Sequence, residues 1–399
     1  MKLLFVHSTK VKEDKEGNLY TNRSYNEDVW NRYLSISSEL SFIARKDSNI
    51  YDVNYAQKTF NLLDDKKIKF IEIPNLTSSF KSYLSIQKNK ELHKIIKEHV
   101  MKSDCLIIRL PSSLGNIAIK YARLFNKPYL TEVVGCAWSA LWYHSLKGKI
   151  LALKSYLKMK KSVKNSPFII YVTNEFLQRR YPTLGKSINC SNVVLQEFDD
   201  KVLENRLNKI RNKSKNDTIV LGTIGALDVR YKGQKHVIKA ISKLNRQGFC
   251  FEYHLVGGGD KTYLNNVARK YDVVDKVKFL GSLSHENIFK YLDSIDIYIQ
   301  PSDTEGLPRA LIEAMSRGCP AIGTNVGGIP ELLDDDCIFK KSDSNELASI
   351  IKSIGLNKDW LIKIAKRNFE EAKKYDKKVI EERRNRFLKE FSEYTKKVI

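Results

Sequence analysis

The stretch from Ile295 to Glu331 constrains the fold of this chain more than any other. At its start, isoleucines alternate with more polar residues at positions 295, 297 and 299, and this period of two predicts a strand. A polar loop follows, and Pro308 then stands where a helix accepts a proline, in its first turn. Gly318 and Pro320 end that helix before a second apolar run. Strand, loop, helix and strand in this order predict an α/β domain with a parallel sheet.

Two carboxylates flank the predicted helix start. Glu305 stands just before the helix, and Glu313 lies about a turn and a half inside it. Free backbone amides at a helix N-terminus attract phosphate, and carboxylates accept hydrogen bonds from sugar hydroxyls. This combination suits the diphosphate and sugar of a nucleotide sugar. The plainer interpretation is a core strand–helix unit in which both glutamates are incidental.

The spacing of these residues resembles a known family. The pattern PSxxEGxPxxxxEAMxxGxP, followed by GGIPE, is similar to the donor-site motif of retaining glycosyltransferases of family 4 (glycosyltransferase group 1), of the bacterial surface-polysaccharide type. Weaker family features cover about residues 218–340. The resemblance implies the GT-B fold, in which two Rossmann-like α/β domains with parallel sheets face each other across a cleft. It also implies a C-terminal helix that crosses back to the N-terminal domain.

The length of the chain supports two domains, because 399 residues exceed what a single core usually serves. From Gly185 to Thr218 the composition shifts to charged and amide residues, which is typical of a linker. We therefore expect an N-terminal acceptor domain at 1–190, completed by a C-terminal helix at 377–399. The expected linker is 191–217, and the expected nucleotide-sugar domain is 218–376.

Strands and helices are expected to alternate through the N-terminal half. Apolar runs predict strands at 1–7, 104–110 and 128–134. Helical spacing predicts helices at 26–45 and 82–102, and the polar residues 8–23 are expected to form a loop. This alternation predicts a second parallel sheet.

The acceptor side is expected where the predicted strand 128–134 ends, because open α/β sheets bind ligands at the carboxyl ends of their strands. Many family members carry a histidine there, and Val134 occupies that position in this chain. Either the histidine is absent or its role passes to Glu132 or His144. The expected acceptor-side residues are Glu132, Gly135, Trp138 and His144.

The donor side is expected in the second half. By the resemblance, Lys232 holds the donor diphosphate, as a lysine beside a helix start can. Relatives usually have an arginine where Ala226 stands, so either fewer cations hold the diphosphate or Arg230 substitutes. Glu305 is expected to meet the sugar, and Glu313 the ribose. The expected donor-binding residues are Arg230, Gly225, Gly258, Gly281, Leu283, Gly306, Leu307 and Glu313.

Catalysis is assigned to Glu305 and Lys232, because the leaving nucleoside diphosphate gains negative charge that must be stabilised. No protein nucleophile stands out, so we expect the acceptor to attack from the leaving-group face, with the departing phosphate taking its proton. The two glutamates are not the acid–nucleophile pair of a glycosidase. The aspartates 334–336 are expected in a solvated turn, and neither a metal nor a cofactor is predicted.

The net charge of +23 is compatible with nucleic acid, an anionic membrane or anionic substrates as partners. No arginine-rich tract or zinc spacing favours nucleic acid, so none is expected. Residues 147–164 carry seven lysines and no acid, which indicates either a solvated helix face or a helix that docks on anionic lipid. Six scattered cysteines and the absence of a signal peptide or membrane span predict a cytoplasmic protein, with the inner membrane face as a second location.

These features favour an enzyme that moves a sugar from a UDP- or GDP-linked donor to a saccharide or lipid-linked acceptor. A nucleotide-sugar epimerase of GT-B architecture is a second hypothesis, against which the EGxPxxxxE spacing argues. A non-catalytic protein that binds nucleotide sugars or nucleic acid is a third.

Overall fold

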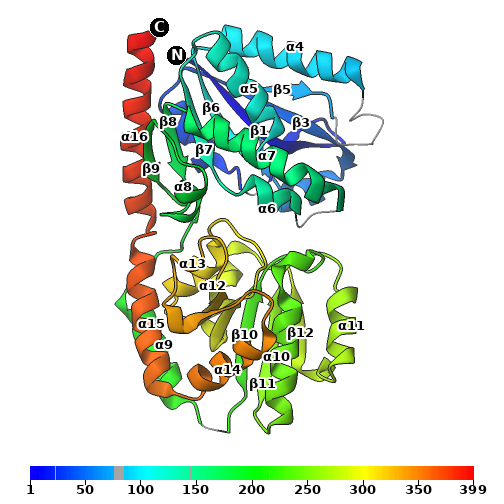
Figure 1. Ribbon diagram of the computed structural model, residues 1–399, viewed down its shortest axis with the longest axis vertical. Helices are drawn as coiled ribbons and strands as arrows, with labels where there is room; N and C mark the ends of the chain where they lie inside the picture. The colour runs from blue at the N-terminus through cyan, green and yellow to red at the C-terminus, as the bar shows by residue number, and fades with distance from the viewer. Residues whose placement is uncertain (23, 76–84, 143–145, 215) are drawn as a thin grey trace. The chain divides into compact units, whose positions relative to one another are not determined.

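The computed structural model describes residues 1–22, 24–75, 85–142, 146–214 and 216–399 and divides into two compact α/β units (Figure 1). Unit 1 comprises Met1–Val172, Gln178–Cys190 and Glu382–Ile399. Unit 2 comprises Thr173–Leu177 and Ser191–Glu381. Each unit holds its own sheet and core.

The sheet of unit 1 is parallel along the order β5-β3-β1-β6-β7-β8-β9, and the short strands β2 and β4 extend it with antiparallel pairing to β1 and to each other. Its strands are β1 (Lys2–Asp14), β2 (Leu19–Thr21), β3 (Glu39–Tyr51), β4 (Asn61–Leu62), β5 (Ile68–Ile73), β6 (Cys105–Leu110), β7 (Tyr129–Val133), β8 (Phe168–Tyr171) and β9 (Lys186–Asn189). All six residues of β6 are buried, as expected for a strand covered on both faces.

Helices α4, α5 and α7 lie over one face of this sheet (Figure 1). Among the described residues before 180, the helices are α1 (Glu27–Leu34), α2 (Val53–Thr59), α4 (Ile86–Lys102), α5 (Ser113–Leu124), α6 (Ala137–Trp142), α7 (Leu146–Lys164) and α8 (Phe176–Arg180). Asn26 caps α1 by accepting from the backbone N–H of Val29.

Two expectations for the first fifty residues are wrong. The helix predicted at 26–45 ends at Leu34, and residues 39–51 form β3 instead. The loop predicted at 8–23 is partly strand, because β1 continues to Asp14 and turns at Gly17 (φ +84°) into β2. Both differences have one cause: β1 and β3 pair in parallel along nearly their whole length. This long-range pairing overrides the local helical spacing.

The sheet of unit 2 is parallel throughout, in the order β12-β11-β10-β13-β14-β15. Its elements are α9 (Asp200–Asn212), β10 (Ile219–Ile224), α10 (Gln234–Arg246), β11 (Phe251–Val256), α11 (Thr262–Lys270), β12 (Val277–Gly281), α12 (His285–Ser294), β13 (Ile297–Gln300), α13 (Arg309–Ser316), β14 (Ala321–Thr324), β15 (Ile338–Phe339), α14 (Ser344–Gly355) and α15 (Lys358–Lys373). The carboxyl ends of these strands meet at one edge, where loops can assemble a ligand site.

The stretch that opened the sequence argument folds as strand, loop, helix and strand. Strand β13 is fully buried between β10 and β14. Two details differ from the expectation: Ile295 caps the end of α12 instead of opening the strand, and Pro308 is the N-cap of α13 instead of lying in its first turn. The aspartates 334–336 are exposed, as expected for a solvated turn.

Much of the segment predicted as a linker is helical. Helix α9 buries Arg206, Leu207 and Ile210 in unit 2. The last helix, α16 (Lys377–Val398), contributes its residues from Glu382 onward to unit 1. There, Phe168 of β8 contacts Phe387, Phe391 and Tyr394 with ring centroids 5.3–5.5 Å apart.

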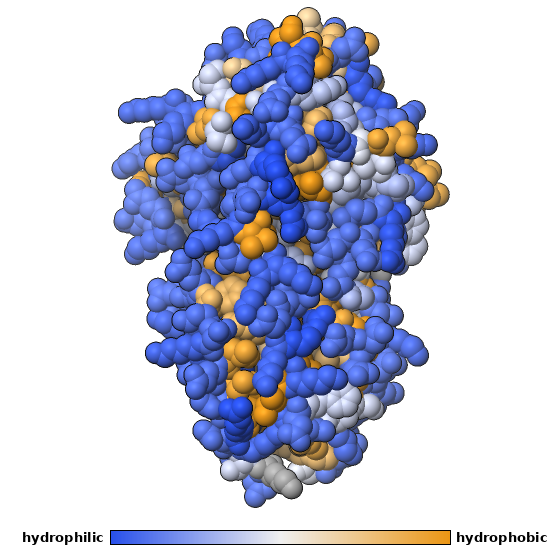
Figure 2. All heavy atoms as spheres, turned by 90° about the vertical axis from the view of Figure 1, so that its left-hand side faces the viewer, coloured by the Kyte–Doolittle hydropathy of each residue, from blue (hydrophilic) through white to orange (hydrophobic). Residues whose placement is uncertain are grey.

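The face of the molecule shown in Figure 2 is mostly hydrophilic, and its apolar residues form small separate groups. Within the described ranges, no helix combines the length and the apolar character that crossing a bilayer requires.

Candidate active site

The loop 301–307 between β13 and α13 presents Glu305 at the carboxyl edge of the unit 2 sheet. One carboxylate oxygen, Oε1, accepts hydrogen bonds from Lys232 Nζ (2.6 Å), Ser302 Oγ (2.8 Å) and Gln300 Nε2 (3.2 Å). No described residue is recorded as donating to Oε2. Three donors on one oxygen fix the orientation of the carboxylate, so its second oxygen remains available to a ligand hydroxyl.

Glycines hold this loop against its neighbours on two sides. Gly233 has φ +75°, and a Cβ atom there would lie 1.8 Å from the carbonyl oxygen of Pro301. Gly327 has φ +62°, and a Cβ atom there would lie 2.4 Å from the carbonyl oxygen of Glu305. The N–H of Gly328 also donates to the carbonyl of Gly306 (2.7 Å). The backbone around Glu305 is therefore clamped between the start of α10 and the loop after β14.

Two helices begin beside this loop without a side-chain cap. Helix α10 follows Gly233, and α13 follows Pro308. Their first backbone amides have no partner inside the helix, so they can donate to an anion. Lys232 lies immediately before α10, and Gly306 and Leu307 lie immediately before Pro308. These are the groups that a diphosphate would require.

Glu313 lies in the second turn of α13. Burial raises the pKa of its carboxyl above the ordinary value, and the charges of Arg309 and His285 only partly oppose this. No hydrogen bond or ion pair to this carboxylate is recorded among the described residues. Glu313 is half-buried, and a carboxylate without a partner inside the protein is suited to accept hydrogen bonds from a ligand.

The predicted donor-side glycines come together. Their loops follow the adjacent strands β10, β11 and β12. The N–H of Leu227 donates to the carbonyl of Gly258 (2.9 Å), and the N–H of Gly257 donates to the carbonyl of Gly281 (2.9 Å). A Cβ atom at Gly257 would lie 2.0 Å from the carbonyl oxygen of Gly225. Three segments far apart in sequence thus form one backbone-lined surface.

Arg230 and Leu283 lie at the margins of this surface. Arg230 is exposed in a single 3₁₀ turn, Arg230–Lys232, and its guanidinium lies 4.7 Å from the ring centroid of Tyr263. Leu283 is half-buried just beyond Gly281. The position where relatives have an arginine, Ala226, accepts a hydrogen bond from Gln234 Nε2 through its carbonyl (3.0 Å).

The predicted acceptor-side residues belong to unit 1, where Glu132 is buried in β7. Arg109 donates to its Oε2 through Nε (2.8 Å) and pairs with it through Nη2 (2.6 Å), and Tyr33 donates to Oε1 (2.6 Å). Burial acts to raise the pKa of Glu132, but Arg109 and these hydrogen bonds outweigh it and lower the pKa to about 2. The carboxylate is therefore engaged within the protein.

The other acceptor-side residues surround the start of α6. Gly135 and Trp138 are half-buried, and Trp138 stacks on Trp142 with ring centroids 5.0 Å apart. His144 lies outside the described residues. A half-exposed pair of indole rings offers a flat apolar surface beside the carboxyl end of β7.

Sequence reasoning missed the side chains that hold the predicted carboxylates. Gln300 and Ser302 bind Glu305, and Arg109 neutralises Glu132. A usable signal existed for each: Gln300 and Arg109 are polar residues within otherwise apolar strands, and such a residue is usually buried with a partner. No group of three or more His, Cys, Asp or Glu side chains in the described part of the chain could hold a metal ion.

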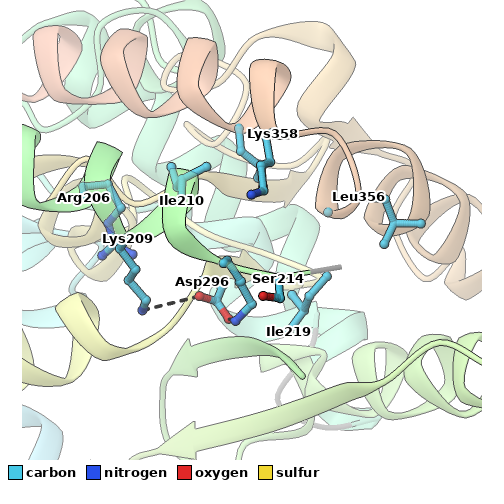
Figure 3. A pocket seen from close by; sticks show the side chains of 11 residues that line it. Arg206, Lys209, Ile210, Ser214, Ile219, Asp296, Leu356 and Lys358 are labelled. Carbon is cyan, nitrogen blue, oxygen red and sulfur yellow. Dashed lines mark hydrogen bonds and ion pairs between the residues drawn. The ribbon is translucent and has the colours of Figure 1, made fainter. Parts of the chain in front are cut away.

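A pocket of about 320 Å³ lies elsewhere in unit 2, beside α9 and the α14–α15 junction (Figure 3). Asp296 precedes β13 and Ile219 begins β10, so this pocket is at the amino edge of the sheet. Lys209 and Lys213 pair with Asp296, and Arg206 donates to the carbonyls of Leu292 and Ile295. Arg206, Lys209 and Lys213 therefore bind the end of α12 and Asp296, away from the donor loop.

Comparison with known proteins agrees with this geometry. The family described as "Glycosyl transferases group 1" matches residues 205–376. The chain is 35% identical to Protein CapJ of Staphylococcus aureus over 364 residues, which cover 90% of this chain and 88% of that protein. It is 38% identical over 130 residues to the amylovoran biosynthesis glycosyltransferase AmsK of Erwinia amylovora, covering 30% and 32% of the two chains.

Solved structures share the fold across the whole chain. Sucrose-phosphate synthase from Thermosynechococcus elongatus superposes with a TM-score of 0.66 at 16% identity, covering 98% of both chains. Anabaena HepE in complex with UDP-glucose superposes with a TM-score of 0.64 at 16% identity, covering 98% of this chain and 100% of the other. The predicted α/β class with two parallel sheets of the GT-B type is thus confirmed. The chain belongs to the group 1 glycosyltransferases, and it is a transferase of GT-B fold.

Proposed function

We propose that this protein is a retaining glycosyltransferase that moves a sugar from a UDP- or GDP-linked donor to a saccharide or lipid-linked acceptor in cell-surface polysaccharide synthesis. The observation that carries the proposal is Glu305, whose Oε1 is held by three donors while Oε2 has no recorded partner. Two of the similar proteins support the proposed pathway and the proposed donor. AmsK is named as an amylovoran biosynthesis glycosyltransferase, and HepE was solved in complex with UDP-glucose.

The proposed mechanism assigns one task to each group. Glu305 accepts from sugar hydroxyls and orients the reacting carbon, and Glu313 accepts from the ribose. Lys232 and the first amides of α10 and α13 stabilise the diphosphate as it gains charge. The bond from the sugar carbon to phosphate breaks while the acceptor oxygen bonds to the same face of that carbon. The departing phosphate oxygen takes the acceptor's proton, so no protein base, metal or cofactor is required.

The proposal is tested by incubating the protein with a panel of UDP- and GDP-sugars and measuring slow release of free sugar. A transferase hydrolyses one donor in the absence of acceptor, whereas an epimerase would interconvert sugars and a binding protein would leave every donor intact. Glu305→Ala should lower hydrolysis at saturating donor by at least about a hundredfold. Lys243→Ala, an exposed lysine of α10 outside the proposed site, should retain wild-type turnover. Undiminished turnover in Glu305→Ala contradicts the role of Glu305.

We further propose that unit 1 docks on an anionic membrane surface through α7, which would make the protein peripheral at the inner membrane face. Helix α7 carries no acid, and its Ile150, Leu153 and Leu157 are 81%, 54% and 54% exposed. The pKa of Lys158 is lowered by partial burial and then by Lys154 and Lys120, so cations crowd there. Exposed apolar residues among lysines suit the headgroup region of an anionic bilayer.

Sedimentation with vesicles tests this surface. The wild type should bind phosphatidylserine-containing vesicles and not pure phosphatidylcholine vesicles, and binding should weaken between 0.05 and 0.5 M NaCl because salt screens the lysines. Leu153→Glu should weaken binding by about tenfold, whereas Leu62→Glu, an equally accessible leucine of β4, should not. Equal binding by both variants would exclude α7 as the docking element.

A further inference from the structure

His236 is a buried histidine beside the donor loop that the proposed mechanism does not use. It lies in the first turn of α10, and the residue is 4% exposed. Neither ring nitrogen has a hydrogen-bond partner among the described residues. The nearest ionic group is Asp303, whose Oδ1 lies 3.7 Å from Nε2. A buried polar ring without a partner costs stability, so its presence calls for a state in which it is paired.

Asp303 belongs to the loop that carries Glu305, two residues away. Its N–H donates to the carbonyl of Tyr231 (2.7 Å), and its Oδ1 accepts from Ser342 Oγ (2.9 Å). A shift of less than 1 Å would bring Oδ1 within hydrogen-bond distance of His236 Nε2. His236 and Asp303 therefore face each other across the junction between α10 and the donor loop, with a short gap between them.

The side-chain tie that the structure shows across this junction is the bond from Lys232 Nζ to Glu305 Oε1 (2.6 Å). Lys232 is also the proposed ligand of the donor diphosphate. When Lys232 turns toward that anion, its bond to Glu305 must weaken, because an ammonium shared among more acceptors holds each less tightly. A second side-chain tie to α10 would then supplement the backbone bond from Asp303 N–H to the carbonyl of Tyr231.

We propose that His236 is a positioning residue: when donor binds, its Nε2–H donates to Asp303 and holds the loop 301–307 against α10. The inference rests on the proposed function, since it requires a nucleotide-sugar donor at Lys232. The charged groups that act electrostatically on the ring are Asp303, Lys235, Lys239 and Lys341. Burial is the main cause that lowers the pKa of His236, to about 4, and the three lysines add to it while Asp303 opposes it. At neutral pH the ring is uncharged and can donate one N–H without burying a cation.

Donor hydrolysis and thermal unfolding of four proteins test this role: wild type, His236→Leu, His236→Gln and the control His254→Leu. His254 lies in the same unit, on β11 beside Glu252, and outside the donor loop. His236→Leu should lower kcat for donor hydrolysis by about ten- to a hundredfold, the worth of a hydrogen bond to a carboxylate. Its Tm without donor should equal or exceed that of the wild type, because no existing hydrogen bond is lost.

His236→Gln should recover at least half of the decrease in log kcat that His236→Leu causes, because its amide N–H can reach the position of Nε2. His236→Leu combined with Asp303→Ala should lose no more than Asp303→Ala alone, since both remove one contact. Wild-type kcat in His236→Leu overturns the inference and leaves the proposed function intact. A lowered Tm in His236→Leu without rescue by glutamine shows a merely structural role. If the wild type hydrolyses no donor, the proposed function fails and the inference fails with it.

Discussion

At the residue scale, the two glutamates of the donor motif differ in how the protein holds them. Glu305 is fixed by three donors on one oxygen, whereas Glu313 is half-buried with no recorded partner among the described residues. The hydrogen bonds to Glu305 fix the orientation of its free oxygen toward a ligand hydroxyl. The partly buried carboxylate of Glu313 lacks a donor, and a ligand hydroxyl can supply one. Glu305 is therefore an oriented hydrogen-bond acceptor, whereas the carboxylate of Glu313 has its pKa raised by burial.

Glu313→Gln tests the acceptor role of Glu313. Because the folded-state pKa of Glu313 is raised, the folded protein without donor binds the proton more readily than the unfolded chain does, and this contribution to stability is lost as pH rises through the folded pKa. Donor affinity should depend on pH in the opposite direction and increase as pH rises, since the ribose hydroxyls need the ionised carboxylate as their acceptor. We expect the wild-type KM for donor to rise as pH falls toward the raised pKa, and this dependence to disappear in Glu313→Gln. Donor titrations and thermal unfolding from pH 4.5 to 8 measure both, and an unchanged pH profile of KM contradicts the role.

Arg109→Met tests the buried pair in unit 1. It would leave the Glu132 carboxylate buried beside Tyr33 alone, which should lower the free energy of unfolding by about 3–5 kcal/mol. The matched control is Arg317→Met, whose partner Asp293 is exposed, so it should cost less than about 1 kcal/mol. Urea denaturation at pH 7 measures both, and similar losses in the two variants would contradict the interpretation.

The same pair has a predicted pH dependence. The pKa of Glu132 is lowered to about 2 in the folded state, so its stabilising contribution is complete above the unfolded value of about 4.3. That contribution should be lost as pH falls from about 4 toward 2. In the double variant Arg109→Met, Glu132→Gln, the acid-dependent loss should disappear together with the charge.

At the element scale, loops rather than helices determine the donor site. The turn after β14 and the start of α10 press on the donor loop through glycine backbone, with no side chain between them. Such contacts leave no room for a Cβ atom. Because backbone packs directly on backbone, the position of Glu305 is closely fixed. The donor loop is therefore positioned by glycines that lie in other loops, Gly233 before α10 and Gly327 after β14.

Gly327→Ala should disturb that contact. The new Cβ atom would lie 2.4 Å from the carbonyl oxygen of Glu305, so the loop must move. We expect affinity for UDP or GDP, measured by calorimetry, to fall at least about tenfold. Gly248→Ala is the matched control: its φ is +87°, and nothing lies within 4 Å of the added atom, so it should cost only about 1–2 kcal/mol of stability. Equal nucleotide affinity in both variants would contradict the role of this contact.

At the scale of the whole molecule, net charge dominates. A charge of +23 on 399 residues repels itself, and the basic face over α7 concentrates part of it. Salt screens this repulsion within a Debye length of about 10 Å at 0.1 M. The same screening that should release the protein from anionic vesicles should therefore stabilise its fold.

Differential scanning calorimetry in 0.05 and 0.5 M NaCl measures the effect. We expect Tm to rise by about 2–4 °C, which corresponds to about 1 kcal/mol for a unit of this size. Because the chain has two compact units, each resolved transition is assigned its own Tm. A fall in Tm over this range would mean that attractive ion pairs outweigh the repulsion.

The local sequence determined those parts of the protein whose physics is local. The alternation and spacing in residues 295–331 specified strand, loop, helix and strand, and the motif around Glu305 specified the family. Gly225 and Gly258 were predicted because each follows a predicted strand, and Gly281 was predicted from the family resemblance. These features depend on short-range steric and hydrogen-bonding rules that a few neighbouring residues suffice to express.

Tertiary structure alone decided what depends on distant partners. Residues 39–51 became a strand because β1 pairs with them, although residues 39–45 had been predicted as the end of a helix. Glu132 became one half of a buried ion pair because Arg109 lies on the adjacent strand. Lys232 reaches Glu305, 73 residues away in sequence, because the parallel strands β10 and β13 bring their carboxyl ends to one edge. The free energy of a pairing, a burial or a charge depends on its partner, and the sequence around one residue does not contain that partner.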